Sequence, residues 1–201
     1  MSEVESTRFL EIEHKFIVTE DFDVPGFFAR VRAQHPQKEY ETRVADTYYL
    51  LKAVPHLVYR HRFDGLIQHL TAKSVSSQDS ETRTEINLEL NVPVGDQGEA
   101  IAAFLTPFGI EWSGSLQKDV QVFYFDNVEI VYYRATFGER IVTCIELEAR
   151  FPDSINSARN VLENWELRLG LVPSKRSHLS LLHLLVLETL PIKLKEKLAS
   201  M

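Results

Sequence analysis

The most constraining feature of the sequence is a short apolar strand pattern near its start that carries three charged side chains. Within residues 9–16, Glu11, Glu13 and Lys15 occupy every second position and alternate with mostly apolar residues. Because successive side chains of a strand point to opposite faces, these charges share one face. Two carboxylates and an ammonium are costly to bury in an apolar core, so this face has to meet water, a metal or other charges. The pattern therefore predicts a strand that lines a polar cavity.

The composition is typical of a globular protein with one core. The chain has 201 residues, of which 44% are hydrophobic and 25% are charged, and its formal net charge is -7. This length predicts one domain over residues 1–201, with a flexible N-terminus at residues 1–7. The negative net charge argues against a nucleic-acid-binding protein, but it leaves room for a local basic pocket that binds an anionic substrate.

Cysteine usage and hydropathy indicate the compartment. The single cysteine, Cys144, excludes an internal disulfide framework and a cysteine-rich zinc site, and it fits a reducing compartment. The N-terminus lacks the pattern of a signal peptide, and the longest apolar run, residues 179–187, is far too short to span a membrane. We therefore expect a cytoplasmic protein that contacts no membrane, and the sequence predicts no particular oligomeric state.

Eight strand patterns follow one another along the chain, mostly joined by short turns. They cover residues 9–16, 38–50, 56–63, 66–74, 81–92, 118–125, 128–135 and 140–150. These segments are rich in Tyr, Thr and Val and alternate between polar and apolar positions. Asp64-Gly65 predicts a two-residue hairpin turn, and residues 74–80 form a polar, serine-rich loop.

Helical patterns separate groups of these strands. They cover residues 25–35, 100–108, 155–169 and 177–189. Asp96 and Glu99 have the spacing of a capping box, and Asp153 or Ser154 is the expected N-cap of the third helix, which ends at Gly170. Hairpin-connected strands with helices between groups predict an α+β fold, an eight-stranded antiparallel closed β-barrel with helices packed outside.

Charged side chains two residues apart recur on the later strands. These are Arg60 and Arg62, Lys73, Arg83 and Glu85, Lys118, and Glu146 and Glu148. Taken one pair at a time, such residues fit the solvent-facing side of a sheet. The opposite faces are apolar, however, as at Ile86 and Leu88 on one strand and Ile145 and Leu147 on another. We therefore predict a barrel that is polar inside and apolar outside, under a coat of helices.

A lumen that contains both signs of charge indicates one class of ligand. Arginine forms bidentate contacts with phosphate, and lysine supplies a point charge. Carboxylates in the same cavity would repel a polyanion unless a divalent cation such as Mg²⁺ or Mn²⁺ bridged them. The predicted ligand is therefore a metal-bound polyphosphate.

The ordered set of motifs resembles the CYTH, or triphosphate tunnel metalloenzyme, superfamily over nearly the whole chain. The matching segments are Glu11-x-Glu13-x-Lys15, Asp46-Thr47-Tyr48-Tyr49, Arg60-His61-Arg62, Leu70-Thr71-Ala72-Lys73, Arg83-Thr84-Glu85, Lys118, Glu146-Leu147-Glu148, and residues 177–182 near Lys175 and Arg176. The Asp46 segment and the Phe137-Gly138 turn look most like the thiamine-triphosphatase branch. The resemblance implies an eight-stranded antiparallel tunnel that binds a triphosphate.

By position, the resemblance also implies roles for individual residues. Phosphate binding falls to Lys15, Arg60, Arg62, Lys73, Arg83, Lys118 and Lys175. Two Mg²⁺ or Mn²⁺ ions would be held by Glu11, Glu13, Glu85, Glu146 and Glu148, one orienting the phosphates and the other positioning or activating a water. Lys15, Glu146 and Glu148 are the implied catalytic residues. The chain departs from the family pattern at Asp119, Tyr133 and Asn87, where a basic residue and two acidic residues are usual.

The resulting hypothesis is a metal-dependent hydrolase of the terminal phosphoanhydride of a small-molecule triphosphate. Inorganic tripolyphosphate, thiamine triphosphate and a nucleoside triphosphate all remain candidate substrates. Two alternatives stay open. One is an adenylate cyclase of the same fold, which would release pyrophosphate and cyclic AMP, and the other is a non-catalytic module that binds polyphosphate or nucleotides.

Overall fold

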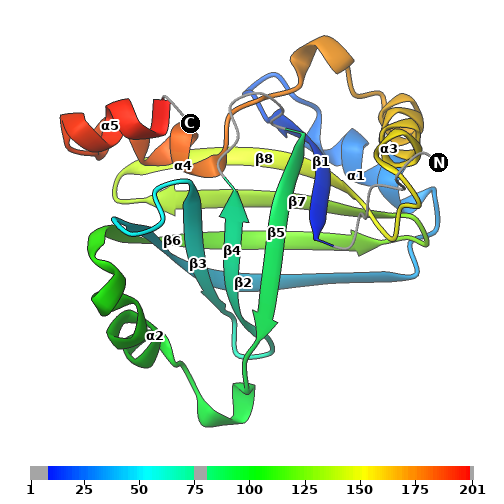
Figure 1. The fold of residues 1–201 in the computed structure, drawn as a ribbon. Coiled ribbons are helices and arrows are strands. Elements are labelled where there is room, and N and C mark those ends of the chain that lie inside the picture. The colour runs from blue at the N-terminus through cyan, green and yellow to red at the C-terminus, as the bar shows by residue number, and fades with distance from the viewer. Residues whose placement is uncertain (1–8, 75–80, 200–201) are drawn as a thin grey trace, which may run out of the picture.

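The centre of the computed structural model is a closed antiparallel β-barrel (Figure 1). The structure describes residues 9–74 and 81–199, so the expected flexible segment 1–7 and the serine-rich loop at 75–80 lie outside the described residues. The strands are β1 (Leu10–Ile17), β2 (Lys38–Leu51), β3 (Leu57–Phe63), β4 (Gln68–Ser74), β5 (Thr82–Glu89), β6 (Ile110–Tyr124), β7 (Val128–Phe137) and β8 (Arg140–Ala149). They pair in the order β1-β5-β4-β3-β2-β6-β7-β8. The predicted α+β class and eight-stranded closed barrel are confirmed.

The strand β6 is longer than its sequence indicates. It begins at Ile110 rather than at residue 118, and it pairs with β2 from Lys38↔Tyr124 to Leu51↔Ile110. Serine and glycine occupy much of its first half, in which Ile110 is the one β-branched residue. Pairing with β2 supplies the stabilisation that local propensity does not.

The connection between β3 and β4 is a four-residue loop, so the predicted two-residue hairpin at Asp64-Gly65 is wrong. Asp64 Oδ1 accepts hydrogen bonds from the backbone N–H groups of Leu66 at 2.8 Å and Ile67 at 2.7 Å. Gly65 adopts a φ of +83°, which glycine tolerates best. The aspartate side chain thereby organises a wider turn than the dipeptide alone predicts.

The helices are α1 (Val24–Arg32), α2 (Gly98–Leu105), α3 (Ile155–Leu169), α4 (Leu181–Leu185) and α5 (Ile192–Ala199). The predicted cap of α3 is confirmed, because Ser154 Oγ accepts a hydrogen bond from Ser157 N–H at 3.1 Å and Gly170 ends the helix in the left-handed region. The predicted capping box of α2 is wrong. Asp96 Oδ1 instead accepts a hydrogen bond from Gly98 N–H, and the N-cap Gln97 makes no side-chain cap.

The C-terminal helical region is also shorter and more broken than predicted. A 3₁₀ turn spans Pro173–Lys175, and α4 then begins only at Leu181, capped by Ser180. A further turn, Leu187–Thr189, and Pro191 precede α5, which the sequence did not indicate. Pro191 has no backbone N–H to donate, and it separates the turn Leu187–Thr189 from α5.

Two of the three hydrophobic clusters cover the outside of the barrel. One lies between the outer faces of β1 and β6 to β8 and the helices α1 and α3, which Figure 1 shows on one side of the molecule. The other packs α2 against the outer face of β2. The coat is incomplete at β5, because Ile86 and Leu88 on its outer face are 40% and 57% exposed. The prediction that this apolar face builds core is therefore wrong for these two residues.

The third cluster fills one end of the barrel from within. It joins lumen-facing apolar residues of β2, β6, β7 and β8 to α4 and to the segment that follows it. Leu116, Ala135 and Cys144 contribute from the strands, and Leu182 and Leu185 from α4, and all five are buried. This end is therefore packed as core, and the polar part of the lumen lies beyond it.

No helix among residues 9–74 and 81–199 combines the length and the apolar character that crossing a membrane requires.

Candidate active site

The lumen contains a cavity of about 340 Å³. All but one of the charged residues singled out from the sequence line it. These residues are Glu11, Glu13, Lys15, Arg60, Arg62, Lys73, Arg83, Glu85, Lys118, Glu146 and Glu148. They come from β1, β3, β4, β5, β6 and β8, so the strand alternation seen in the sequence brings distant segments to one site.

Lys175 is the exception. It lies in the 3₁₀ turn Pro173–Lys175, where its side chain is exposed, and it is not part of the cavity lining. Its expected phosphate-binding role is therefore not supported. The residues by which this region reaches the cavity are His178, Ser180, Leu181, Leu182 and His183.

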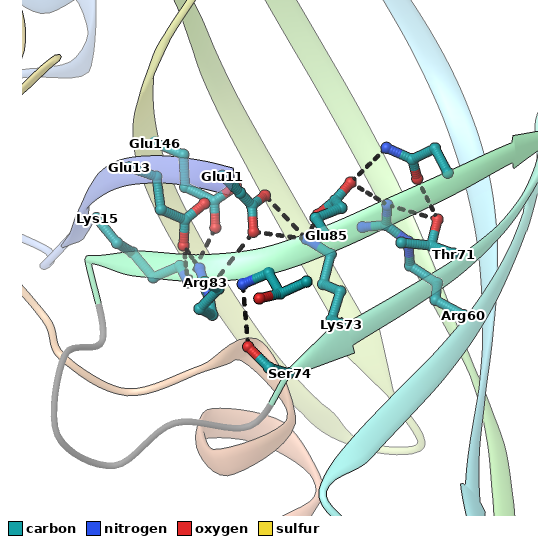
Figure 2. A network of polar contacts seen from close by, with 12 residues as sticks. Glu11, Glu13, Lys15, Arg60, Thr71, Lys73, Ser74, Arg83, Glu85 and Glu146 are labelled. Carbon is teal, nitrogen blue, oxygen red and sulfur yellow. Dashed lines mark hydrogen bonds and ion pairs between the residues drawn. The ribbon is translucent and has the colours of Figure 1, made fainter. Parts of the chain in front are cut away.

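Every carboxylate on β1 is paired with a cation from its own strand or from β4 and β5 (Figure 2). Lys15 Nζ donates to Glu13 Oε1 at 3.0 Å, and Arg83 donates to the same oxygen. Lys73 Nζ donates to both oxygens of Glu11, at 2.9 and 3.0 Å. Although burial disfavours the charged form of Glu11, Lys73 and Arg83 outweigh it and hold the pKa of this carboxyl well below its usual range.

A second group of contacts extends the network toward β3 and β4. Lys73 also contacts Glu85, and Arg60 lies 3.6 Å from Glu85 Oε1. Arg60 donates to Thr71 Oγ1 at 3.3 Å, and Thr71 in turn donates to Asn87 Oδ1 at 2.6 Å. Asn87, one of the departures from the family pattern, thus joins the lining as a hydrogen-bonding residue without a charge.

Glu146 is held by a lysine and a tyrosine. Lys15 Nζ lies 3.1 Å from Glu146 Oε1, and the Tyr133 hydroxyl donates to the same oxygen at 2.7 Å. Burial would raise the pKa of Glu146, but the charges of Lys15 and Lys118 and the Tyr133 hydroxyl lower it to about 2. Tyr133, another departure from the family pattern, is therefore a neutral donor in the lumen that keeps Glu146 ionised.

Asp46 is a functional candidate to which sequence reasoning assigned no role. It is fully buried on β2, and Arg62 forms a bidentate contact with it, Nε to Oδ1 at 2.8 Å and Nη2 to Oδ2 at 2.9 Å. Lys118 Nζ lies 2.7 Å from Oδ2. Asp46 thus fixes two of the expected phosphate ligands. Its position in the same alternating face as Tyr48 was the available signal, but its partners lie on β3 and β6 and only the register reveals them.

Glu148 and Glu129 form the least neutralised part of the lining. They are opposite each other in the β7–β8 register, and Glu13 is opposite Glu148 on the other side. Burial raises the pKa of Glu148 well above its usual value, and the neighbouring carboxylates of Glu11 and Glu129 add to this effect. Burial also raises the pKa of Glu129, which sequence reasoning missed.

The described part of the chain does not present a preformed metal cage. No three His, Cys, Asp or Glu side chains within it are grouped so that they could hold a metal ion. The reason is visible in Figure 2, where Lys73 and Arg83 lie among the carboxylates and pair with them. The lumen is thus neutralised by its own side chains.

No protein-family model matches the chain, and no curated protein matches it either. Solved structures do match. The PH1012 protein from Pyrococcus horikoshii is 19% identical with a TM-score of 0.70, and the match covers 87% of this chain and 99% of that one. A candidate adenylate cyclase from Vibrio parahaemolyticus is 15% identical with a TM-score of 0.61, over 86% and 95% of the two chains.

A third similar structure is a candidate adenylyl cyclase from Hippeastrum that reveals a dominant triphosphatase activity. It is 13% identical with a TM-score of 0.51, and the match covers 80% of this chain and 88% of that one. At these identities the likenesses show a shared fold. They agree with the barrel described above over most of its length.

Proposed function

We propose that this chain is a metal-dependent triphosphatase of the CYTH type, which hydrolyses the terminal phosphoanhydride of a triphosphate. The observation that carries the proposal is the lumen itself, in which lysines and arginines from β1, β3, β4, β5 and β6 converge on one cavity beside six glutamates. Triphosphatase activity in the Hippeastrum protein, which shares the fold, supports the proposal. The likeness to a candidate adenylate cyclase is compatible with the same ligand class.

The basic side chains of the lumen suit a polyphosphate in number and in geometry. Arg62 is held in one orientation by Asp46, and Arg60 is tethered to Thr71, so both guanidinium groups are positioned before a ligand arrives. Such preorganisation lowers the entropic cost of binding and lets planar guanidinium groups contact phosphate oxygens in pairs. Lys15, Lys73, Arg83 and Lys118 supply further positive charge around the same cavity.

The carboxylates fit a divalent metal by their chemistry. Glu11, Glu13, Glu85, Glu146 and Glu148 present the oxygen donors that Mg²⁺ and Mn²⁺ prefer. Glu148 supports such a fit, because burial and then the neighbouring carboxylates raise its pKa, and a bound cation would offset both effects. A bound divalent ion would supply charge neutralisation of the phosphates and Lewis acidity.

The ion pairs within the lumen suggest how these two components bind together. Lys73 and Arg83 neutralise Glu11 and Glu13 in the described structure. If both cations turn toward an incoming phosphate, Glu11 loses its partners, Glu13 keeps Lys15 alone, and both carboxylates become available to a metal. Metal and triphosphate would then each strengthen the binding of the other, and thermodynamic linkage requires that this effect be mutual.

Phosphate release measured with three substrates tests the proposal. Purified protein would be incubated with inorganic tripolyphosphate, thiamine triphosphate or a nucleoside triphosphate, each with Mg²⁺, with Mn²⁺ or with a chelator. We expect metal-dependent release of orthophosphate from at least one substrate. Arg60→Gln should reduce this activity strongly, whereas Arg43→Gln, which alters an exposed arginine on the outer face of β2, should not. Absence of turnover for all three substrates with both metals would contradict the proposal.

One observation favours a second candidate, a module that binds polyphosphate without hydrolysing it. Within residues 9–74 and 81–199, no three carboxylates are arranged as a metal cage. Calorimetry separates this candidate from the first, because it predicts tight tripolyphosphate binding that needs no metal and is followed by no phosphate release. Product analysis separates a cyclase, which would form pyrophosphate and cyclic AMP from ATP.

A further inference from the structure

The lumen has a second wall whose chemistry differs from that of the charged one. Four of the side chains facing the cavity from β2, β6 and β7 are aliphatic and four are tyrosines, while Lys118 and Glu129 are the charged ones; the aliphatic residues are Val44, Val120, Val122 and Val131. In the order of the closed barrel, these three strands lie across the lumen from β1, β5 and β4, which carry Glu11, Glu13, Lys15, Lys73, Arg83 and Glu85. One side of the cavity is therefore mostly ionic, and the other consists mostly of valines and tyrosines.

Three of the four valines adjoin one another, and Val44 lies opposite Lys118 in the β2–β6 register. Val122 is opposite Val131 in the β6–β7 register, and Val120 lies on the same face two residues away. Tyr40 is opposite Val122 in the β2–β6 register, so an aromatic ring adjoins the valine surface. We call Val44, Val120, Val122 and Val131 the valine wall.

An aromatic pair continues the valine wall. The rings of Tyr40 and Tyr124 stack with a centroid separation of 6.1 Å and an interplanar angle of 17°, and both side chains line the cavity. The Tyr124 hydroxyl is hydrogen-bonded to Tyr40 and to Glu129. Lys38 Nζ lies 4.7 Å from the centroid of the Tyr40 ring, and Arg150 Cζ lies 5.1 Å from that of the Tyr124 ring. This end of the cavity thus combines two aromatic rings with hydroxyl groups and the half-buried Glu129, whereas Lys73, Arg83 and Glu11 occupy the opposite wall.

An inorganic polyphosphate gains no favourable contact from the valine wall. Every part of it is ionic and hydrated, and placing it against valines removes water without returning hydrogen bonds. A ligand with a charged chain at one end and a ring at the other would meet the matching surface at each end. Apolar contact with the valines and aromatic contact with the tyrosines then add to the ionic contacts.

We propose that the valine wall and the Tyr40–Tyr124 pair bind the organic ring of a triphosphate ester, so that the preferred substrate is an organic triphosphate and not inorganic tripolyphosphate. This inference rests on the proposed triphosphate-binding function of the charged wall. Nucleoside triphosphates and thiamine triphosphate share the required chemistry, a triphosphate joined to a ring system.

Kinetics with matched substrates and a valine-wall variant test the inference. Val122→Thr keeps the side-chain size but places a hydroxyl in the apolar wall. We expect KM for the preferred organic triphosphate to rise roughly 10-fold, in line with the loss of a small apolar contact in a pocket, while KM for tripolyphosphate stays unchanged. Val94→Thr, at an exposed valine outside the cavity lining, is the control and should change neither value.

A second variant keeps the test decisive if Val122→Thr folds poorly. Tyr40→Ala removes one ring of the stacked pair from a half-buried position and should raise KM for organic triphosphates alone. Comparing a nucleoside triphosphate with thiamine triphosphate then identifies which ring the wall accepts. Melting temperatures of both variants confirm that the folded protein is being compared.

The outcomes separate this inference from the proposed function. Faster turnover of tripolyphosphate than of both organic triphosphates, or an equal rise in KM for all substrates, would overturn the inference while leaving the triphosphatase intact. If nothing is hydrolysed, binding constants decide. Tighter binding of an organic triphosphate than of tripolyphosphate, abolished by Val122→Thr, would support the inference even though the hydrolase proposal fails, and equal binding would overturn it.

Discussion

The two faces of β1 carry buried charges in two different settings. On the inner face, Glu11, Glu13 and Lys15 line the cavity and pair with residues of β4, β5 and β8. On the outer face, His14 Nδ1 lies 2.7 Å from Glu166 Oε1 on α3. Arg176 donates to both oxygens of Glu166, each at 2.7 Å.

The difference between these two sites is access to a cavity. Glu166 is fully buried beneath α3, and its partners hold it from two directions, so the outer network can change only if the helix moves. The inner pairs border a cavity of about 340 Å³, in which water or a ligand can replace one partner. The same kind of buried ion pair therefore serves stability on one face of the strand and leaves the other face free for binding and exchange.

Glu13→Gln tests the difference between the two faces of β1 most directly, and we expect it to have the largest effect. Loss of a carboxylate from the expected metal-binding set should reduce metal-dependent hydrolysis roughly 100-fold or more, since even residues behind a metal ligand contribute up to that amount. The melting temperature should change little, because Lys15 and Arg83 can rehydrate from the cavity. Glu41→Gln, on the exposed face of β2, is the matched control. A large fall in melting temperature would assign Glu13 a structural role instead.

Glu166→Ala should have the opposite effect, a loss of stability without a change in triphosphate binding. It leaves His14 and Arg176 without their buried acceptor, and breaking a buried pair in this way costs about 3 kcal/mol of the free energy of unfolding. Urea denaturation measures this loss, while triphosphate binding by the remaining folded protein should be unchanged. Glu163→Ala, which removes a more exposed acid 4.0 Å from the same arginine, is the control. Equal stability of both variants would contradict the structural role of the outer network.

Tyr133→Phe probes one hydrogen bond on the inner face. Removing the hydroxyl frees Glu146 Oε1 from its 2.7 Å contact, and a hydrogen bond to a charged group contributes about 2 kcal/mol. We expect a decrease in kcat of roughly 10-fold with little change in KM, because the ring still fills its buried site. Tyr132→Phe, at the neighbouring outward-facing tyrosine, should leave the kinetics unaltered. Similar kinetics for the two variants would show that Tyr133 only packs.

The smallest expected effect is a dependence of stability on pH that belongs to the outer network. Although burial raises the pKa of Glu166, hydrogen bonds from His14 and Arg176 outweigh it and hold the pKa below the usual 4.5. A carboxyl with a lowered pKa stabilises the fold above 4.5, and this contribution is lost as pH falls below that value. The urea midpoint of the parent protein should therefore fall more steeply in acid than that of Glu166→Gln. Parallel curves would refute this assignment.

Strand alternation predicted the barrel and most of the candidate site because the period of two is a local property of the chain. Glu11, Glu13 and Lys15 share a face whatever strand they pair with, and the same holds for Arg60 and Arg62. The buried position of Asp46 between Arg62 and Lys118 depends on registers between strands, which no local pattern specifies. The predicted phosphate-binding role of Lys175 is not supported for a related reason. The place of its side chain depends on how a short turn packs against the barrel, which no local pattern specifies.

The closure of the barrel also affects the rate at which this protein folds. The strands β1 and β8 pair, so Glu13 and Glu148, which are far apart in the sequence, lie opposite each other. Such distant pairings require the closure of a long loop before they return any stabilisation, which slows folding. The cavity around the inner charges of β1 is therefore complete only once β1 and β8 have paired.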